Sequence, residues 1–420
     1  MFALADANNF YASCETIFRP DLRGKPVCVV SNNDGCVIAR SAEAKRMGIK
    51  MAAPWFKHER YFRDNGVHVF SSNYELYGDM SARMMAILDE MAAGQEVYSI
   101  DESFLDVTGI SSYMPLERFG QQMRERVRQE TGLTIGVGFG PTKTLAKLAN
   151  QAAKQWTKTN GVVDLSDPLR QQKLLQLTRI GDIWGIGWRI AQRLEEMGIT
   201  TGLHLAESNT STIRKKFDVI VERIARELRG ESCLALEDAP PPKQQIVNSR
   251  SFGQRITTLD DMQQAVMAYA TRAAEKLRQQ GSRCRHLTVS VTTGRYGDDP
   301  RYSATAPVSW QYPTADTRDI VAFALQGLNA IWRDGFRYAK AGVMLSDFWQ
   351  SGSTQFDMFS QQQLRANADA LMTALDAINR SGKGKIGFAS QTTGNQAWQM
   401  KRNMLSPRYT TRLADIPVIR

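Results

Sequence analysis

Three consecutive prolines constrain this chain more than any other sequence feature. Residues 239–243 read Ala-Pro-Pro-Pro-Lys, and prolines in series favour a stiff, extended spacer that neither a helix interior nor a sheet can accommodate. The 420 residues are enough for roughly two to four domains, each with its own core. We therefore expect the linker 239–243 to separate two independently packed parts.

Before the linker, apolar runs and amphipathic helices alternate. Strands are expected at 2–6 and 133–138, and the run 97–107 is expected to form a strand pair with a hairpin bend at Asp101-Glu102. Helices are expected from about residue 9, over 116–127 and over 141–154. This order of elements predicts a βαββαβ, ferredoxin-like unit. Residues 20–76 interrupt it and look like an inserted subdomain, and 166–238 is predicted to be helical.

After the linker a similar pattern begins again. Strands are expected at 246–256, 286–292, 302–310 and 336–348, and helices over 262–277 and 321–332. These elements predict a second βαββαβ unit, although no sequence repeat relates it to the first. The tail beyond Phe348 is rich in Ser, Gln, Gly and Asn, so we expect it to be only partly ordered, with one helix over 364–378.

The excess of positive charge lies entirely in the C-terminal part. The sequence holds 53 Lys and Arg against 43 Asp and Glu, a net charge of +10. Residues 1–242 carry 30 residues of each sign, so the whole excess follows them. Charge that served only solubility would have no reason to segregate in this way, and nucleic acid is therefore the favoured partner.

Composition argues against several other classes of protein. No run approaches the ~18 apolar residues of a membrane-spanning helix, and the N-terminus lacks the basic start of a secretory signal. The five cysteines are scattered and include no C-x-x-C pair, which disfavours a disulfide framework or a structural zinc site. We expect a cytoplasmic protein with no membrane partner.

Three carboxylates are expected to meet at one edge of the first sheet. Asp6 ends the first predicted strand, and Asp101 and Glu102 lie on the hairpin expected to pair beside it. Such carboxylates repel one another unless a cation neutralises them, and oxygen ligands without His or Cys suit Mg²⁺, with Mn²⁺ as an alternative. Two ions could activate a 3′-hydroxyl and stabilise a leaving pyrophosphate. The competing interpretation is an ordinary surface Asp-Glu pair.

A second candidate site follows the glycine-rich turn 136–140. Lys143 and Lys147 lie one helical turn apart and share a helix face, and Lys154 follows on the same helix. This face could meet a triphosphate, or it could simply be solvated. Neither a Walker A motif nor G-x-G-x-x-G occurs, which disfavours a P-loop or Rossmann nucleotide site.

A third candidate is the glycine turn inside the helical region. Gly185-Ile186-Gly187, with Arg189 just beyond it, resembles a helix–hairpin–helix turn. In that motif, backbone N–H groups bind one DNA phosphate without reading base sequence. An ordinary connection between helices is the alternative.

Six short motifs follow one another in order along nearly the whole chain. They are Asp-Ala-Asn-Asn-Phe-Tyr at 6–11, Ser-Ser-Asn-Tyr at 71–74, Tyr-Ser-Ile-Asp-Glu at 98–102, Thr-Lys-Thr-Leu-Ala-Lys at 142–147, the glycine turn at 185–187 and Met-Leu-Ser-Pro-Arg-Tyr-Thr-Thr-Arg at 404–412. This set resembles the Y-family (UmuC-type) translesion DNA polymerases. Several of the motifs are weak alone, and their joint occurrence is specific.

The resemblance implies an α+β multidomain fold. It comprises a ferredoxin-like (βαββαβ) palm with inserted fingers, a helical thumb with a helix–hairpin–helix, a second βαββαβ little-finger domain and a partly ordered C-terminal tail. The implied boundaries are palm 1–20 and 77–165, fingers 21–76, thumb 166–238, linker 239–243, little finger 244–350 and partner-binding tail 351–420. The implied activity is error-prone, template-directed translesion DNA synthesis in an SOS-type response, by two-metal nucleotidyl transfer without proofreading.

The resemblance also implies roles for individual residues. Asp6, Asp101 and Glu102, with the carbonyl of Ala7, would bind two Mg²⁺ ions. Tyr11 matches the steric gate, whose ring fills the space that a ribose 2′-hydroxyl would need. The other candidates are the nucleotide-binding residues Phe10, Arg40, Lys45 and Lys147, and the DNA-binding residues Gly185, Gly187, Arg189 and Arg250. Many relatives carry Tyr-x-x-Arg in the fingers; this chain has Ala and Lys45 there, and lysine provides charge without a planar fork.

A short apolar motif in the tail suggests a protein partner. Gln355-Phe356-Asp357-Met358-Phe359 looks like the pentapeptide by which bacterial polymerases dock on the sliding clamp. In that mode Gln355 makes polar contacts, and Met358 and Phe359 fill an apolar cleft. A tail folded back over the last strand is the alternative.

The resemblance implies further partners and a cellular setting. The partners are primer–template DNA, deoxynucleoside triphosphates, a UmuD′-type dimer and a RecA filament, and the setting is the bacterial cytoplasm, at the nucleoid. Two other functions remain open at this point: a nucleotidyl cyclase built on a similar palm, and a non-catalytic DNA-binding scaffold.

Overall fold

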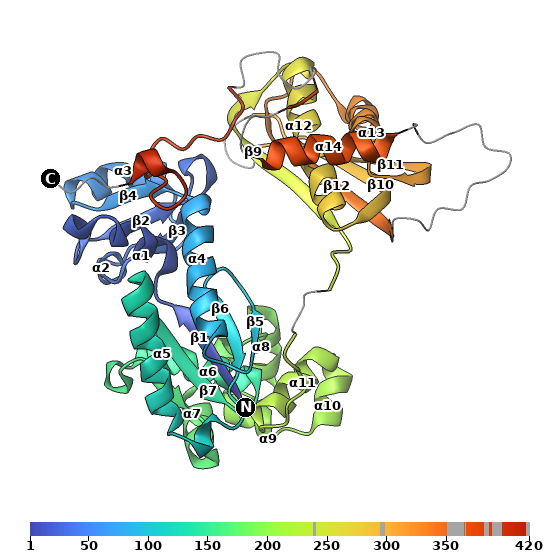
Figure 1. Cartoon of the computed structure of the whole chain (residues 1–420). Helices are drawn as coiled ribbons and strands as arrows, with labels where there is room; N and C mark the ends of the chain where they lie inside the picture. The colour runs from blue at the N-terminus through green and yellow to red at the C-terminus, as the bar shows by residue number, and fades with distance from the viewer. Residues whose placement is uncertain are drawn as a thin grey trace. The chain divides into compact units, whose positions relative to one another are not determined.

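The computed structural model describes residues 1–237, 241–294, 299–350, 365, 367–381, 386–388 and 397–416. The chain divides into two compact units, and the division falls within the proline run. Unit 1 comprises Met1–Ser31, Gly35–Pro240 and Met404–Arg420, and unit 2 comprises Asn32–Asp34 and Pro241–Asn403. Figure 1 labels their elements. Among the described residues, no helix is both long and apolar enough to cross a membrane.

The N-terminal strand lies at the centre of a five-stranded sheet in unit 1. The sheet order is β5-β6-β1-β7-β8, with β1 at Phe2–Ala7, β5 at Gly94–Val97, β6 at Glu102–Asp106, β7 at Ile135–Gly140 and β8 at Val162–Asp164. β1 pairs antiparallel with both β6 and β7. Apart from β8, which is added parallel to β7, this is the predicted ferredoxin-like arrangement. The run 97–107 bends as a hairpin, as predicted, but the turn lies at 98–101, between β5 and β6, and Glu102 is already the first residue of β6.

Alternation along β1 separates its two faces. Ala3, Ala5 and Ala7 belong to a core shared with α1 (Phe10–Ile17), α4 (Tyr74–Asp89) and α5 (Leu116–Thr131). Leu4 instead packs with Phe104 and with Ala146 of α6 (Lys143–Gln155). Because successive side chains of a strand point to opposite faces, Asp6 lies on the α6 face with Leu4.

A glycine permits α6 to approach the sheet closely. A Cβ atom at Gly138 would collide with the main chain of α6 at Asn150. The Asn150 side chain then donates hydrogen bonds to the carbonyl oxygens of Leu4 (3.1 Å) and Gly136 (2.7 Å). These contacts fix α6 against β1 and β7 and set which of its residues reach the sheet edge.

A small mixed sheet is inserted between α1 and α4. Its order is β3-β2-β4, with β2 at Val27–Val30, β3 at Val37–Arg40 and β4 at His68–Ser71. The insertion also contains α2 (Ala42–Arg46), α3 (Trp55–Asp64) and the 3-10 turn η1 (Pro20–Leu22). The 3-10 turn η2 (Asn32–Asp34), between β2 and β3 in the sequence, is grouped with unit 2. Cys28, Val30, Val37 and Phe62 form part of a core of its own. The insertion is therefore a separately packed subdomain, as the sequence pattern predicts.

Short helices follow β8. They are α7 (Pro168–Leu177), α8 (Trp188–Glu196), α9 (Gly202–Glu207), α10 (Thr210–Lys216) and α11 (Val219–Leu228), with η3 (Ile110–Ser112), η4 (Thr157–Thr159) and η5 (Ile180–Asp182) as 3-10 turns in unit 1. Their core includes residues of α6, so they pack beside the first sheet. Gly185 has φ +86 and a Cβ there would lie 2.7 Å from Ile224, which explains why the turn before α8 needs glycine.

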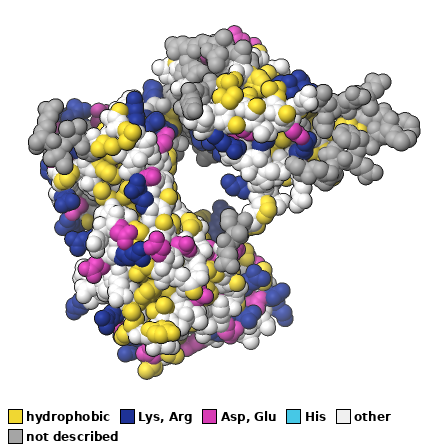
Figure 2. Space-filling model, viewed as in Figure 1, with side chains coloured by type: hydrophobic (Ala, Val, Ile, Leu, Met, Phe, Trp, Pro, Cys, Tyr) yellow, Lys and Arg dark blue, Asp and Glu magenta, His cyan; other side chains and the backbone are white. Residues whose placement is uncertain are grey.

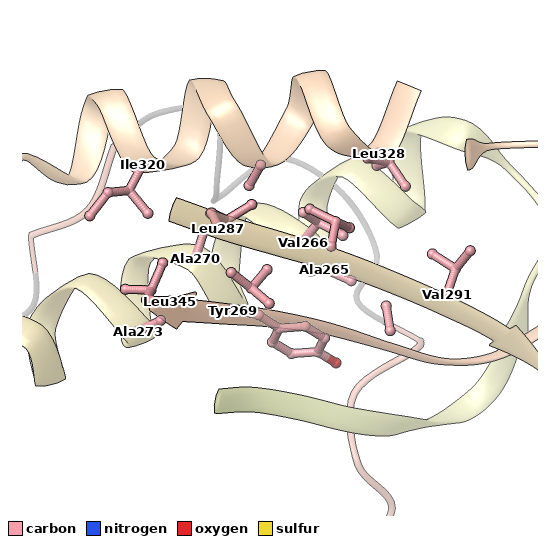
Figure 3. Close-up of a cluster of buried hydrophobic side chains, with 14 of the residues drawn as sticks. Ala265, Val266, Tyr269, Ala270, Ala273, Leu287, Val291, Ile320, Leu328 and Leu345 are labelled. Atoms are coloured by element: carbon pink, nitrogen blue, oxygen red, sulfur yellow. The ribbon is translucent and has the colours of Figure 1, made fainter. Parts of the chain in front are cut away.

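Unit 2 contains a four-stranded antiparallel sheet with two helices on one face. The elements run β9 (Ile246–Ile256), α12 (Leu259–Gln279), β10 (Ser282–Thr293), β11 (Ser303–Thr314), α13 (Thr317–Ile331) and β12 (Tyr338–Gln350). Figure 3 shows their core, where Tyr269 and Ala273 of α12 and Ile320 of α13 face Leu287 and Leu345 of the sheet. The βαββαβ order is as predicted. The strand order β11-β10-β12-β9 nevertheless differs from that of the first sheet.

Parts of the C-terminal tail are well packed. Helix α14 (Ala368–Arg380) begins later than the predicted 364. Its buried Asp376 accepts two hydrogen bonds from Arg278 of α12 (2.7 and 2.8 Å). A further segment, 404–416, belongs to unit 1, where it ends in η7 (Leu413–Asp415).

Candidate active site

Two of the three predicted carboxylates lie side by side. Asp6 of β1 is the register partner of Glu102 of β6, so both side chains leave the sheet on the α6 face. Asp101 precedes Glu102 in the turn, where its main-chain oxygen accepts a hydrogen bond from Ala7 N (2.9 Å). Ser99 Oγ donates to Asp101 Oδ1 (2.7 Å). The ends of β1 and β6 therefore bring Asp6 and Glu102 together, and the structure does not place the Asp101 side chain in the same group.

Three lysines of α6 form ion pairs with acidic residues of the sheet, among them Asp6 and Glu102. Lys143 pairs with Glu96, Lys147 Nζ lies 3.1 and 3.2 Å from the two Glu102 oxygens, and Lys154 pairs with Asp6. Residues spaced by four and then seven positions fall on one helix face. Sequence reasoning did not place Lys154 in the site, although its spacing from Lys143 and Lys147 already carried that signal.

The charge balance at Asp6 depends on its burial. Burial raises the pKa of Asp6 to about 6, the Lys154 ammonium opposes the rise and Glu102 adds to it. A divalent cation would favour the ionised form and remove the repulsion from Glu102. The donor set is oxygen throughout, which fits a hard cation. As the side chains stand, no three His, Cys, Asp or Glu residues of the described part of the chain are gathered closely enough to hold a metal ion, and lysines supply the positive charge.

The site opens into a cavity of about 320 Å³. Its walls include Asp6, Glu102, Lys147, Lys154 and Trp184. Lys147 Nζ lies 4.7 Å from the ring centroid of Tyr98 and 5.4 Å from that of Trp184. Aromatic faces can stabilise this ammonium group beside the carboxylates.

The inserted subdomain adds positive charge on the same side. Burial lowers the pKa of Lys45, and the charges of Arg40 and Lys154 lower it further, whereas Asp6 opposes the change. Lys45 therefore interacts electrostatically with both members of the Asp6–Lys154 pair. Arg40 Nη1 donates to the carbonyl of Ile49, and its buried Nε has no hydrogen-bond partner in the described structure.

Tyr11 lies within a cluster of aromatic rings. Its ring stacks on Tyr77 (centroids 4.5 Å apart, 15° between planes) and meets the edge of Tyr74 (5.9 Å, 88°). Burial raises the pKa of Tyr11 to about 12, and the nearby groups Tyr74, Asp101 and Cys14 contribute to the rise. The Tyr11 hydroxyl therefore stays protonated. Phe10 differs, because the residue is only 3% exposed and belongs to the core under the sheet.

Family models cover most of the chain. One described as the impB/mucB/samB family matches residues 5–151, and one described as the impB/mucB/samB family C-terminal domain matches 243–358. A third, a domain of unknown function (DUF4113), matches 369–419. Protein SamB of Salmonella typhimurium is 56% identical over 420 residues, covering 99% of each chain. Protein UmuC of the same organism is 54% identical over 419 residues, again covering 99% of each.

The chain belongs to the impB/mucB/samB family. Among solved structures, a Y-family DNA polymerase chimera superposes with a TM-score of 0.65 at 20% identity, covering 83% of this chain and 100% of that one. These findings confirm the predicted UmuC-type Y-family and its fold. They also confirm the predicted enzyme class, a translesion DNA polymerase, and do not favour the cyclase or scaffold alternatives. DNA polymerases of this kind use divalent metal ions.

In the thumb of this polymerase fold, the predicted glycine turn connects η5 to α8. Gly187 is the residue before the first turn of α8. Arg189 lies in that first turn, 5.2 Å from the Trp188 ring, and Trp188 is itself 72% exposed. This end of α8 therefore presents N–H groups, a guanidinium and an indole to solvent.

In unit 2, Arg250 lies on the edge strand β9. Its register partner Ala341 is buried against the helices, so the Arg250 side chain leaves the sheet on the helix side. On that side, burial lowers the pKa of Lys276, and the positive charges of Arg272, Arg250 and Lys243 lower it further. These four side chains form a basic cluster. Figure 2 shows Lys and Arg side chains on the visible face of each unit.

The predicted clamp-binding residues Gln355, Met358 and Phe359 lie outside the described residues.

Proposed function

We propose that this polymerase joins deoxynucleotides at Asp6, Asp101 and Glu102 by two-metal nucleotidyl transfer with Mg²⁺, for which Mn²⁺ can substitute. The observation that carries the proposal is the register pairing of Asp6 with Glu102 on a face lined by the lysines of α6. Asp6, Asp101, Glu102 and the Ala7 carbonyl would hold the two ions. When bound, the ions would lower the pKa of the primer 3′-hydroxyl and neutralise charge on the phosphates.

The lysines would then change partners. In the described structure they neutralise the carboxylates, and each is freed when cations take over that role. We assign Lys147 and Lys154 of α6 and Lys45 of the fingers to the incoming triphosphate, with Arg40 beside them. Their grouping around Asp6 supports this assignment, because a triphosphate needs several cationic groups converging on it. The substrate and its metals would thus replace these internal ion pairs.

Sugar selection is assigned to Tyr11. Its ring is backed by Tyr77 and bordered by Tyr74, so it has little room to retreat from a 2′-hydroxyl, and a clash rejects the ribonucleotide. Phe10 is assigned a main-chain contact with the nucleotide, because its side chain is part of the core under the sheet.

The remaining parts are assigned to DNA and protein partners. We divide the chain into a palm (1–20 and 77–165), fingers (21–76), thumb (166–238) and little finger (244–350), joined by the linker 239–243. Gly185, Gly187 and Arg189 of the thumb and Arg250 of the little finger would bind phosphates of primer–template DNA.

The tail, residues 351–420, is assigned to protein partners. Gln355, Met358 and Phe359 would bind the sliding clamp, and a UmuD′-type dimer and a RecA filament would activate the enzyme in an SOS-type response. Similarity to the proteins UmuC and MucB supports the UmuD′-type dimer, whereas the clamp and the RecA filament are proposed from the sequence resemblance alone. We assign the enzyme to the bacterial cytoplasm, at the nucleoid.

Primer extension with an Asp101→Asn variant tests the catalytic proposal. Asp101→Asn should lower the rate of deoxynucleotide addition roughly 10²–10³-fold in Mg²⁺, because the carboxylate charge is lost from the site. Asp106→Asn is the matched control, since Asp106 lies at the far end of the same strand β6 and binds Thr108 instead. Equal extension by Asp101→Asn and wild-type enzyme would show that the carboxylate assignment is wrong.

A further inference from the structure

The C-terminal segment 404–412 is part of the catalytic unit. Met404 and Leu405 continue the edge of the fingers sheet beside β4: Ser71 N donates to the Met404 carbonyl (2.9 Å) and Met404 N donates to Ser71 Oγ (3.0 Å). Tyr409 stacks on Phe18 at the end of α1 (4.8 Å, 13°). Figure 1 shows this segment in red beside β4 and α4. It falls within the domain of unknown function, so the matching family model assigns it no role.

Ser406 is the most deeply enclosed part of this segment. It is 5% exposed, and the fully buried Asn73 donates through Nδ2 to both its hydroxyl oxygen (3.0 Å) and its carbonyl (3.2 Å). Asn73 also caps α4, where its Oδ1 accepts from Leu76 N (3.2 Å). One side chain therefore fixes both the start of α4 and the position of Ser406.

Ser406 in turn binds a buried acid of α1. Its Oγ donates to Glu15 Oε1 (3.1 Å), and Tyr77 OH of α4 donates to the same oxygen (2.6 Å). Glu15 is 0% exposed, and no described residue binds its second oxygen. A buried carboxyl group held by two hydroxyls is sensitive to the loss of either one.

The chain of contacts ends at Tyr11 of α1, the residue that we assign to sugar selection. Tyr77, fixed through its hydroxyl, is the ring on which Tyr11 stacks. The main-chain position of Tyr11 and the side chain of Glu15 belong to the same helix, four residues apart. The contacts therefore run from Ser406 to Glu15, from Glu15 to Tyr77 and from Tyr77 to Tyr11.

We propose that Ser406 and Glu15 are positioning residues for sugar selection, and that the C-terminal segment holds the Tyr11 ring in place through Tyr77. This inference rests on the proposed role of Tyr11 as the steric gate. A steric clash discriminates against a ribonucleotide only if the Tyr11 ring cannot move away from the 2′-hydroxyl. Tyr77, whose own position is fixed by its hydrogen bond to Glu15, packs against the Tyr11 ring and prevents this movement. The segment thus contributes to substrate choice without touching the substrate.

The test is the ratio of kcat/KM for dCTP to kcat/KM for CTP, measured with the full chain on a primer–template with dG at the templating position. Tyr77→Phe and Ser406→Ala should each lower this ratio about fivefold, the effect typical of one buried hydrogen bond. Glu15→Gln keeps an acceptor oxygen and should retain the ratio. Arg412→Ala, in the same segment but solvent-exposed, is the control that should leave it unchanged.

A purely structural role gives a different result. It would lower the use of dCTP and CTP in proportion and leave their ratio unchanged, which would overturn the inference, and Tyr77→Phe tests this with one atom removed and no change of shape. If Tyr11→Ala lowers the ratio while Tyr77→Phe and Ser406→Ala do not, the gate stands and the positioning role is wrong. If Tyr11→Ala itself leaves the ratio unchanged, the gate fails and this inference fails with it.

Discussion

Lys154 of α6 forms an ion pair with Asp6 of β1, so an internal cation neutralises the carboxylate that we assign to metal binding. The same ammonium group acts on Lys45 of the fingers. We expect Lys154→Met to raise the KM for deoxynucleotides about tenfold, because one charge-assisted contact to the triphosphate is lost. The Mg²⁺ concentration for half-maximal activity should not rise, since a competitor for Asp6 is removed.

Lys158→Met is the matched control for this prediction. Lys158 follows α6 in η4 and does not line the cavity of the carboxylates. Steady-state kinetics with varied nucleotide and varied Mg²⁺ distinguish the two variants. An unchanged KM for Lys154→Met would remove Lys154 from the triphosphate site.

Tyr11→Ala should relax sugar selection. Removing the ring opens the space beside Tyr77 that a 2′-hydroxyl would occupy, so incorporation of ribonucleotides should rise relative to deoxynucleotides by roughly one to two orders of magnitude. Single-nucleotide insertion kinetics measure the change. Tyr98→Ala serves for comparison, because Tyr98 contacts Lys147 and Trp184 on the other side of the sheet and should not alter the sugar preference.

The sequence was enough to predict that Asp6 lies beside the Asp101-Glu102 hairpin, and the structure pairs it with Glu102. A short strand ending in a carboxylate and an apolar hairpin carrying Asp-Glu are local patterns, and the split βαβ connection places those strands together. The partner of Asp6 was harder to predict. Lys154 reaches it only because Gly138 lets α6 lie against the sheet, and that packing distance is not encoded in any local window.

Long-range contacts account for most of what sequence patterns did not indicate. Glu15 and Ser406 are 391 positions apart, and a glutamate in a short amphipathic helix would ordinarily be expected at the surface. The polar composition of the tail suggested limited order, whereas Ser406 is buried through specific hydrogen bonds. The strand order of unit 2 was likewise not predictable, because identical βαββαβ patterns allow more than one choice of neighbouring strands.

The buried Glu15 should make the stability of the catalytic unit depend on pH. Burial raises its pKa to about 7 from the ordinary 4.5, against the effect of hydrogen bonds from Tyr77 and Ser406. Cys14 and Tyr409 also face it, and each has a raised pKa. Between pH 4.5 and 7 the folded state binds the Glu15 proton more tightly than the unfolded state, so stability should fall as pH rises through this window, by up to about 3 kcal/mol.

Glu15→Gln should remove this part of the pH dependence, because the amide has no proton to lose. Thermal melting of wild type and variant at pH 5, 6, 7 and 8 gives the comparison, in which the variant gains relative stability towards pH 8. Glu43→Gln, at an exposed ion pair with Arg46, should follow the wild-type profile. Parallel curves for wild type and Glu15→Gln would contradict the assigned pKa.

Replacing Met358 and Phe359 by alanine should abolish stimulation by the sliding clamp. Two large apolar side chains provide most of the affinity of a short peptide in a cleft. Basal primer extension without the clamp should be unchanged, because the motif follows residue 350 in the sequence and includes none of the residues that we assign to catalysis. Loss of basal and stimulated extension together would point to misfolding and count against the assignment.

The basic cluster around Arg250 should determine how DNA binding responds to salt. Each phosphate contact that is lost should make the slope of log K against log salt concentration less negative by about 0.9. We therefore expect Arg250→Ala to change the slope by about one contact in a fluorescence-anisotropy titration from 50 to 300 mM KCl. Arg337→Ala removes the same charge from unit 2 at an ion pair with Asp299, outside the cluster, and should leave the slope as it is. If both variants change the slope equally, the effect is one of overall charge, and Arg250 does not contact a phosphate.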